Sequence, residues 1–192
     1  MAIVPSKKGL SFVAVRDYVG AEFDERAWAE VLGTLSARDA ETLKTVVGVG
    51  WYPIDLYSRL IRAADTTLGK GDLGMVRRVT RFEAERDLPT IHRLLLRIVR
   101  PTFVIEKMGE LWSRYNSTGR FVIELRGERG VEGTIHDWSN DRALCLGTQH
   151  YADRALELAG ARGVRTQHVK CRASGDATCV IRATWSGKDD PV

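Results

Sequence analysis

Three cysteines and one histidine near the C-terminal end are the residues whose types and spacing could do chemistry. They are Cys145, His168, Cys171 and Cys179, which comprise all three cysteines and one of the four histidines in the 192 residues. Zinc favours thiolate and imidazole ligands, and a structural zinc site usually has four of them in a tetrahedron. These residue types therefore predict a structural zinc ion with no open position for catalysis.

The two cysteines nearest the end of the chain flank a turn signal. Ser174-Gly175-Asp176 is typical of a turn, so Cys171 and Cys179 are expected opposite each other on two strands of a hairpin. Two other interpretations stay open at this point. The thiols could be small buried side chains of the core, or the pair could form a cross-strand disulfide, which a cytosolic protein rarely keeps.

The other two candidate ligands come from different elements. Cys145 falls in the first turns of a predicted helix, and either Asn140 or Asp141 would cap that helix. His168 and Cys171 have opposite parity on a regular strand and would point to opposite faces of the sheet. Both can reach one ion only if the strand has a bulge or kink near Val169. Without that bulge, His168 is expected to face solvent.

The spacing of these residues resembles that of the 4-vinyl reductase domain family. The tail reads His168-x-x-Cys171-x7-Cys179, and Cys145 stands 23 positions before the histidine. The family includes sensory domains of phenol-responsive bacterial transcription activators and shares a fold with small subunits of the TRAPP transport particle. In its zinc-bearing members an acidic residue stands where this chain has His168. Residues 50–138 also resemble an uncharacterised bacterial paralogous branch built on the same domain.

The same resemblance to aromatic-sensing domains makes a pocket for a small hydrophobic ligand worth predicting. Its lining would come from aromatic residues of the predicted helices, although each one taken singly is more typical of an ordinary core. The predicted pocket residues are Trp51, Tyr57, Phe103, Trp112 and Tyr115.

Composition and charge limit the class of protein. Hydrophobic residues make up 44% and charged residues 28% of the chain, as in globular domains, and the net charge is +4. No apolar run approaches the roughly 18 residues of a transmembrane helix, and no signal sequence begins the chain, so a cytoplasmic protein is expected. The basic residues between positions 70 and 107 alternate with Glu83, Glu85 and Asp87, which predicts a solvated helical face and does not favour nucleic-acid binding.

Periodicity predicts an α+β fold. Helical spacing of apolar residues over positions 24–116 gives way to a strand-strand-helix-strand-strand pattern over 118–186, typical of an antiparallel sheet covered by helices. Residues 1–9 are expected to be disordered, 10–186 to form one domain, and 187–192 to be a tail. The stretch 11–15 reads as a strand or as a helix, and Pro89 is expected to open a helix over the residues that follow it.

Catalysis is not favoured by any pair of residues. Cys145 and His150 lie five positions apart on a predicted helix and do not share a face well. His92 borders an apolar helical face and is more typical of a core-edge histidine than of a ligand. We therefore expect a non-catalytic sensing or regulatory domain with structural zinc that signals through a partner protein, and we expect it to form a homodimer. The alternatives are a protein-interaction scaffold and an accessory enzyme of tetrapyrrole metabolism.

Overall fold

The computed structural model describes residues 4–87 and 100–188, and it has the α+β fold that the periodicity predicts. The predicted helix after Pro89, and His92 with it, lie outside the described residues. None of the described helices is long and apolar enough to cross a membrane.

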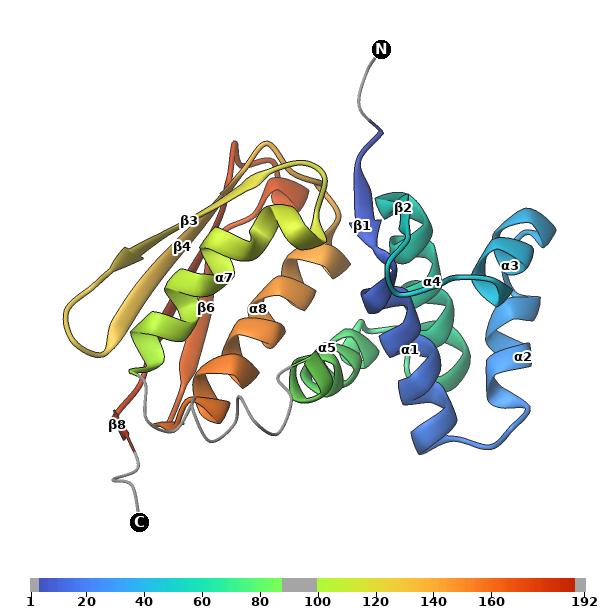
Figure 1. Ribbon diagram of the computed structural model, residues 1–192, viewed down its shortest axis with the longest axis horizontal. Helices are drawn as coiled ribbons and strands as arrows, with labels where there is room; N and C mark the ends of the chain where they lie inside the picture. The colour runs from blue at the N-terminus through green and yellow to red at the C-terminus, as the bar shows by residue number, and fades with distance from the viewer. Residues whose placement is uncertain (1–3, 88–99, 189–192) are drawn as a thin grey trace.

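The N-terminal half is helical, with one short two-stranded sheet (Figure 1). Its elements are β1 (Ser6–Lys8), α1 (Gly9–Glu22), α2 (Ala27–Gly33), α3 (Ala37–Lys44), β2 (Trp51–Pro53) and α4 (Ile54–Leu68). Disorder was expected for residues 1–9, but Ser6–Lys8 form β1, which pairs antiparallel with β2. The structure also settles the stretch 11–15, which belongs to α1. Ser36 caps α3 by accepting a hydrogen bond from the backbone N–H of Asp39.

The C-terminal half is a four-stranded antiparallel sheet in the order β3-β4-β7-β6, with two helices across one face (Figure 1). Its elements are α7 (Pro101–Tyr115), β3 (Arg120–Leu125), β4 (Gly130–His136), α8 (Arg142–Leu158), β5 (Ala161–Arg162), β6 (Arg165–Lys170), β7 (Cys179–Thr184) and β8 (Gly187–Lys188). Asp141 caps α8 through the backbone N–H of Ala143, as the sequence predicts for this helix. The short strands β5 and β8 pair with each other beside this sheet.

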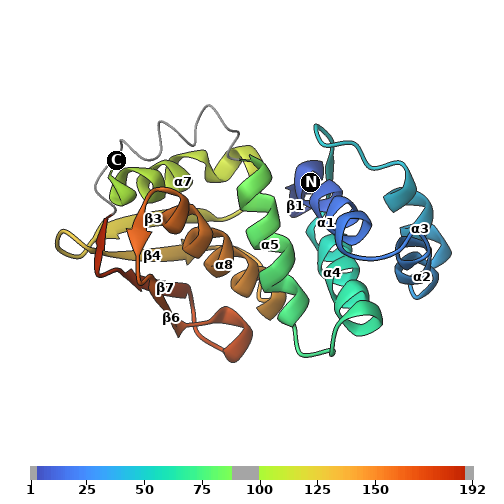
Figure 2. The ribbon, with the colours of Figure 1, turned by 90° about the horizontal axis from the view of Figure 1, so that it is seen from below.

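Helix α5 (Gly74–Asp87) lies between the two halves, with α1 and α4 on one side and α8 on the other (Figure 2). Its start is fixed by the buried carboxylate of Asp65 on α4, which accepts hydrogen bonds from the backbone N–H groups of Leu73 and Met75. Those two N–H groups precede or open the helix and have no partner inside it. Met75, Val76 and Val79 on α5 are buried in the core cluster that joins the halves.

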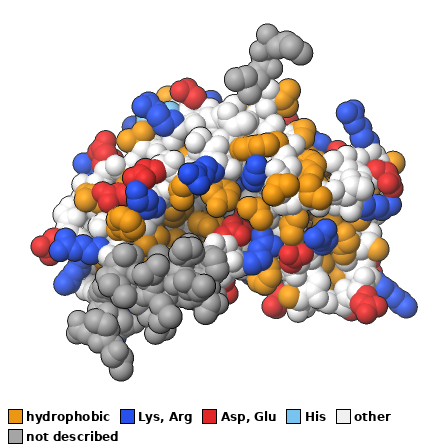
Figure 3. Space-filling model, in the orientation of Figure 1, with side chains coloured by type: hydrophobic (Ala, Val, Ile, Leu, Met, Phe, Trp, Pro, Cys, Tyr) orange, Lys and Arg blue, Asp and Glu red, His pale blue; other side chains and the backbone are white. Residues whose placement is uncertain are grey.

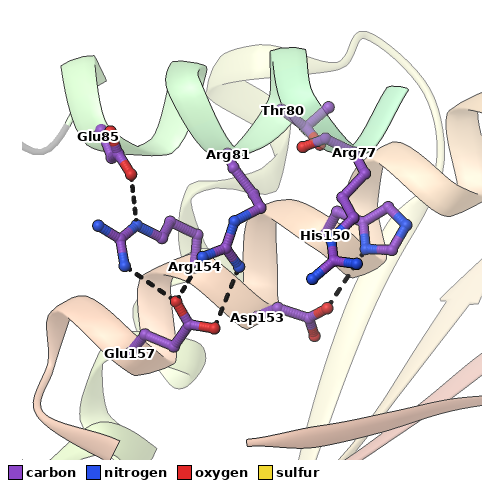
Figure 4. Close-up of polar contacts among 8 residues, drawn as sticks. All are labelled: Arg77, Thr80, Arg81, Glu85, His150, Asp153, Arg154 and Glu157. Atoms are coloured by element: carbon purple, nitrogen blue, oxygen red, sulfur yellow. Dashed lines mark hydrogen bonds and ion pairs between the residues drawn. The ribbon is translucent and has the colours of Figure 1, made fainter. Parts of the chain in front are cut away.

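Charged side chains fasten α5 to both neighbours. Toward α8, Arg81 donates two hydrogen bonds to Glu157, which also accepts one from Arg154, and Arg154 pairs with Glu85 (Figure 4). Toward α1, Arg86 pairs with Asp17 and donates to the carbonyl oxygen of Leu10. Helix α5 is therefore held by ion pairs on both of its flanks.

Candidate functional site

A partly open cavity of about 130 Å³ lies where the two halves meet. Its wall takes residues from β1, α1 and α4 of the N-terminal half, from α5, and from α7, β3 and α8 of the C-terminal half. On the face of the molecule drawn in Figure 3, hydrophobic side chains gather along the middle, between two more strongly charged ends. The cavity is close in size to the engineered apolar cavity of roughly 150 Å³ that binds benzene.

Aromatic rings form much of the cavity wall. Tyr57, Trp112 and Trp138 are each less than 10% exposed, and the rings of Trp112 and Trp138 meet edge to face with centroids 4.8 Å apart. Tyr115 and Tyr151 complete this part of the lining. Such rings offer both apolar area and electron-rich faces to a bound molecule.

Three ionisable side chains enter the same wall. Glu83 and Asp87 lie one helical turn apart on α5, and Lys7 reaches in from β1 with its ammonium 5.4 Å from the centroid of the Tyr57 ring. Glu83 is 5% exposed and accepts a hydrogen bond from the Ser11 hydroxyl. The sequence predicts a solvated helical face for these carboxylates, which is wrong because α5 is enclosed between α1 and α8.

Burial shifts the pKa values of Asp87, Lys7 and Tyr57. It raises the pKa of Asp87 to about 6, assisted by the Glu83 charge and opposed by Arg86 and Lys7. Burial also lowers the pKa of Lys7, which the two carboxylates partly restore. The pKa of the Tyr57 phenol is raised well above its ordinary value by burial and by the same two charges, so the phenol keeps its proton. Among the described residues, Asp87 is also paired with Arg86 at 3.5 Å.

Two polar atoms in this wall have no hydrogen-bond partner among the described residues. They are the side-chain oxygen Oδ1 of Asn116 and the indole Nε1 of Trp138. Both residues line the cavity and are at least 94% buried. An unpaired buried polar atom costs free energy, roughly 1–3 kcal/mol, so each atom favours a polar group placed inside the cavity.

The aromatic residues predicted for the pocket divide into two groups. Tyr57, Trp112 and Tyr115 line the cavity. Trp51 lies outside it and is 44% exposed under the ammonium of Lys8, and Phe103 on α7 is 46% exposed. The carboxylates of α5, Lys7 and the pair of orphaned polar atoms were not predicted. The one sequence signal was the helical spacing of Glu83 and Asp87 among apolar residues.

The cysteines and the histidine form a second cluster. The sulfurs of Cys145, Cys171 and Cys179 and the ring of His168 each offer an atom within 4.8 Å of the others. Both ring nitrogens of His168 are buried without a hydrogen-bond partner among the described residues. All three cysteines are buried and free, and they belong to the main core cluster, so the cluster joins α8 to the β6–β7 connection.

A bulge brings His168 to the side of the cysteines. The pairing of β6 with β7 shifts register between His168 and Lys170, at the position where the sequence required an irregularity. The connection then turns through a 3-10 helix at Arg172–Ser174 and ends at Gly175, whose φ of 97° is easily adopted by glycine. The backbone N–H of Cys171 is held by the Asp176 carboxylate.

The sulfurs of Cys145 and Cys179 lie 3.1 Å apart and share a hydrogen bond. The S–H of Cys145 lowers the pKa of Cys179, and the backbone N–H of Arg172 acts in the same direction. The same hydrogen bond and burial raise the pKa of Cys145. The contact between the two sulfurs therefore shifts their pKa values in opposite directions.

The whole described fold is similar to a set of solved structures. An H-NOX protein from S. oneidensis in the Fe(II) ligation state matches with a TM-score of 0.75 at 15% identity, over 95% of this chain and 98% of that chain. The unliganded Fe(II) H-NOX protein from K. algicida matches with a TM-score of 0.66 at 13% identity, over 94% and 97%. The chain has the H-NOX fold. Its sequence matches no family model and no curated protein.

The H-NOX fold corrects the resemblance drawn from the sequence. The 4-vinyl reductase and TRAPP assignment is wrong, because the similar solved structures are H-NOX proteins. The predicted zinc cofactor is wrong as well, since those structures are described by iron ligation and haem. The geometry gives a physical reason. Two sulfurs on one tetrahedral zinc, each about 2.3 Å from the ion, lie roughly 3.7 Å apart, whereas Cys145 and Cys179 are as close as a hydrogen-bonded pair.

The described residues of this H-NOX fold do not fit a haem group. The cavity, about 130 Å³, is the size of a single small ring and not of a porphyrin. No histidine among the described residues lines it, and the carboxylates of Glu83 and Asp87 stand in its wall. The rings of Trp112 and Trp138 pack edge to face in its wall. The space that the described residues leave suits a smaller and more polar molecule.

Proposed function

We propose that this chain is a non-catalytic sensing domain that binds a small molecule in the cavity between its halves and signals through a partner protein. The observation that carries the proposal is the partly open, mixed aromatic and polar cavity at the junction of the two halves. The H-NOX fold supports it, because solved structures with this fold are described in Fe(II), Fe(II)NO and Fe(II)CO ligation states.

The proposed ligand is not haem, for the reasons of size and lining given above. A purified sample mixed with haem is expected to give no stoichiometric, saturable change in the haem absorption spectrum. A saturable change that disappears when Tyr57 or Tyr115 is replaced by Phe would contradict this part of the proposal. The same size limit gives no support to a tetrapyrrole substrate for an accessory enzyme.

Helix α5 offers a physical route from the cavity to a partner. It contributes Glu83 and Asp87 to the cavity wall, and the same helix is tied to α1 through Arg86 and to α8 through Arg81. A molecule that binds better to one separation of these helices shifts the population toward that separation. The partner would then recognise the surface that changes with it.

A thermal-shift screen with small aromatic and amine compounds tests the proposal, using two leucine-to-tryptophan variants. Leu111 lines the cavity, so Leu111→Trp fills it and is expected to abolish the shift of any compound that binds there. Leu125 lies 48% exposed on the β3–β4 hairpin, so Leu125→Trp is the matched control and should keep the shift. Binding that survives in Leu111→Trp would contradict the proposal.

A protein-interaction module is the second candidate function. The observation that favours it is a group of exposed apolar side chains before and in β2, where Val47 is 55%, Val49 80% and Trp51 44% exposed. Large apolar groups on a surface are typical of docking sites. If no compound shifts the melting temperature and a stable complex with one protein is isolated, this candidate replaces the sensor. That the chain forms a homodimer stays a prediction, and the molar mass measured by sedimentation tests it.

A further inference from the structure

The two borders of the four-stranded sheet differ in their ability to accept another strand. At one border, β6 shifts register between His168 and Lys170, and a bulge beside a lysine protects a strand edge from further pairing. At the other border, all six residues of β3 pair with β4 in unbroken register (Figure 1). No other strand in the described part of the chain pairs with β3. Its outer edge therefore offers backbone groups to a further strand.

Charged side chains on the solvent face of β3 lack complete partners within one copy of the chain. Glu124 lies directly opposite Glu132 of β4, and like charges at opposed positions repel each other. Arg126 contacts both carboxylates, and Glu132 has Arg182 as a second partner. Arg120 is exposed on the same face as Glu124 and forms no ion pair with any described residue. The strand thus has one unpaired cation and one carboxylate that shares its cation.

Antiparallel pairing of β3 with a second copy of itself brings these two charges together. When the two-fold axis lies between the two Val122 residues, Arg120 of each copy lies opposite Glu124 of the other. Opposed Cβ atoms are about 4.5–5.5 Å apart, close enough for the side chains to form an ion pair. The two neighbouring registers lose this match, because they place Arg120 opposite Arg126 or opposite Val122. The strand is therefore complementary to itself in one register.

Apolar side chains border the same edge. A groove between α7 and β3 is lined by Phe103, Val122 and Ile123. Phe103 is 46% exposed, and Leu125 at the end of β3 is 48% exposed. The two-fold axis is perpendicular to the sheet, so the α7 helices of both copies would lie on the same side of the joined sheets. A second copy at this edge therefore removes apolar surface from water in addition to pairing the strands.

We infer that β3 pairs with β3 of a second copy and joins two chains into a homodimer with one continuous antiparallel sheet. Arg120 of each copy binds Glu124 of the other at both ends of the paired strands. The inference goes beyond the proposed sensing function and does not depend on it. A failed ligand screen leaves it standing, and a monomeric protein leaves the sensing function standing.

Charge reversal at each end of β3 tests the inference by sedimentation equilibrium, which measures the dissociation constant of the dimer. The wild-type protein is expected to dimerise. Arg120→Glu sets two negative charges opposite each other at both ends, and Glu124→Arg sets two positive charges there. Each variant alone should raise the dissociation constant by about tenfold or more. A mixture of the two variants has opposite charges at both ends, so it should form a heterodimer as tight as the wild-type dimer.

Two further variants control for effects on other surfaces and on folding. Glu41→Arg reverses a 70% exposed charge on α3, at the opposite end of the molecule from β3, and should leave the dissociation constant unchanged (Figure 1). Circular dichroism checks that each variant is folded. Arg120→Gln removes the charge without reversing it and should weaken the dimer less than Arg120→Glu, so it replaces that variant if the reversal prevents folding.

Three results overturn the inference. They are a wild-type protein that stays monomeric at its highest soluble concentration, a dimer that charge reversal on β3 does not weaken, and a mixture of Arg120→Glu and Glu124→Arg that stays monomeric. A monomeric protein that instead binds a peptide strand from another protein at β3 gives the edge to a different partner and overturns self-pairing as well.

Discussion

Ser11 on α1 donates a hydrogen bond to the carboxylate of Glu83 on α5, with the two oxygens 2.5 Å apart. Both residues are buried, at 1% and 5% exposure, and both line the cavity. The contact joins residues 72 positions apart and connects the N-terminal half to the helix between the halves. A hydrogen bond to a buried charge is stronger than one between neutral groups, so this pair should contribute to stability as well as to the site.

Ser11→Ala is expected to lower the free energy of unfolding by roughly 1–3 kcal/mol, because it leaves a buried carboxylate without its donor. The variant keeps the helix, since alanine is the best helix former. Equilibrium unfolding in urea measures the change. Ser113→Ala, at an exposed position on α7, is the matched control and should change stability by a few tenths of a kcal/mol in either direction. Equal effects of the two substitutions would contradict the role given to Ser11.

Asp87 should make the folded protein less stable as the pH rises. Its pKa is raised from 3.8 to about 6 by burial and by Glu83, so the folded state holds the proton more tightly than the unfolded chain. As the pH rises from 3.8 to about 6, the Asp87 carboxyl loses its proton in the unfolded chain before it does so in the folded protein. The resulting loss of folding stability is complete above about pH 6. The shift corresponds to roughly 3 kcal/mol.

Asp87→Asn is therefore expected to raise the stability at neutral pH by up to about 3 kcal/mol and to have little effect below pH 4. Melting temperatures measured across this pH range check the sign. Asp137→Asn is the control, because Asp137 is exposed and its positive φ is one that asparagine also adopts. A stability gain that is the same at every pH would show that the carboxylate charge is not the cause.

The Cys-His cluster shows how far residue spacing can be taken. The turn at Gly175, the cap at Asp141 and the bulge after His168 were each needed to bring the four side chains together. Local sequence indicated the turn and the cap, whereas it named the bulge only as the condition under which His168 could join the cysteines. Local sequence does not show which helices pack against α5. Helical periodicity is the same for a helix on a surface and for one enclosed between α1 and α8, so Glu83 and Asp87 were assigned to solvent.

The same limit applies to the remaining site residues. Tyr57, Trp112 and Tyr115 were predicted in the pocket and line the cavity, but Trp51 and Phe103 are of the same chemical type and do not. Their placement depends on which face of an element meets the other half of the molecule. Asp65 likewise reads as an ordinary helical aspartate, and only the tertiary fold brings the backbone of Leu73 and Met75 to its carboxylate.

Glu157 should respond to pH in the opposite direction from Asp87. Burial raises its pKa, but the hydrogen bonds from Arg81 and Arg154 outweigh burial and hold the pKa below its ordinary value. A lowered pKa gives stability that is present above the pKa of the unfolded chain and is lost as the pH falls through the folded value. The residues of this network lie together on the flank of α5 and α8 (Figure 4).

Glu157→Gln is expected to cost about 0.5–1 kcal/mol at neutral pH, a modest value because the side chains are about one-third exposed. The loss should shrink in acid and in high salt. Glu110→Gln, which breaks a more exposed pair with Lys107, should cost less. Urea titrations at two pH values compare them. A cost for Glu157→Gln that persists in acid would point to packing instead of charge.

Cys179 lies in the core at 0% exposure and contacts the sulfur of Cys145, so its replacement tests the second cluster. Cys179→Ser places a more polar hydroxyl in the same space and should lower the free energy of unfolding by roughly 1–3 kcal/mol. Thr178→Ser, a half-buried neighbour, is the control. Because the zinc prediction is overturned, the purified wild-type protein is expected to hold no stoichiometric zinc, and elemental analysis checks this. A stoichiometric metal that is lost in Cys179→Ser would support ligation. If the wild-type protein is metal-free and Cys179→Ser still loses stability, the hydrogen-bonded thiols alone join α8 to the last hairpin. A fully stable Cys179→Ser protein would contradict that role of the thiols.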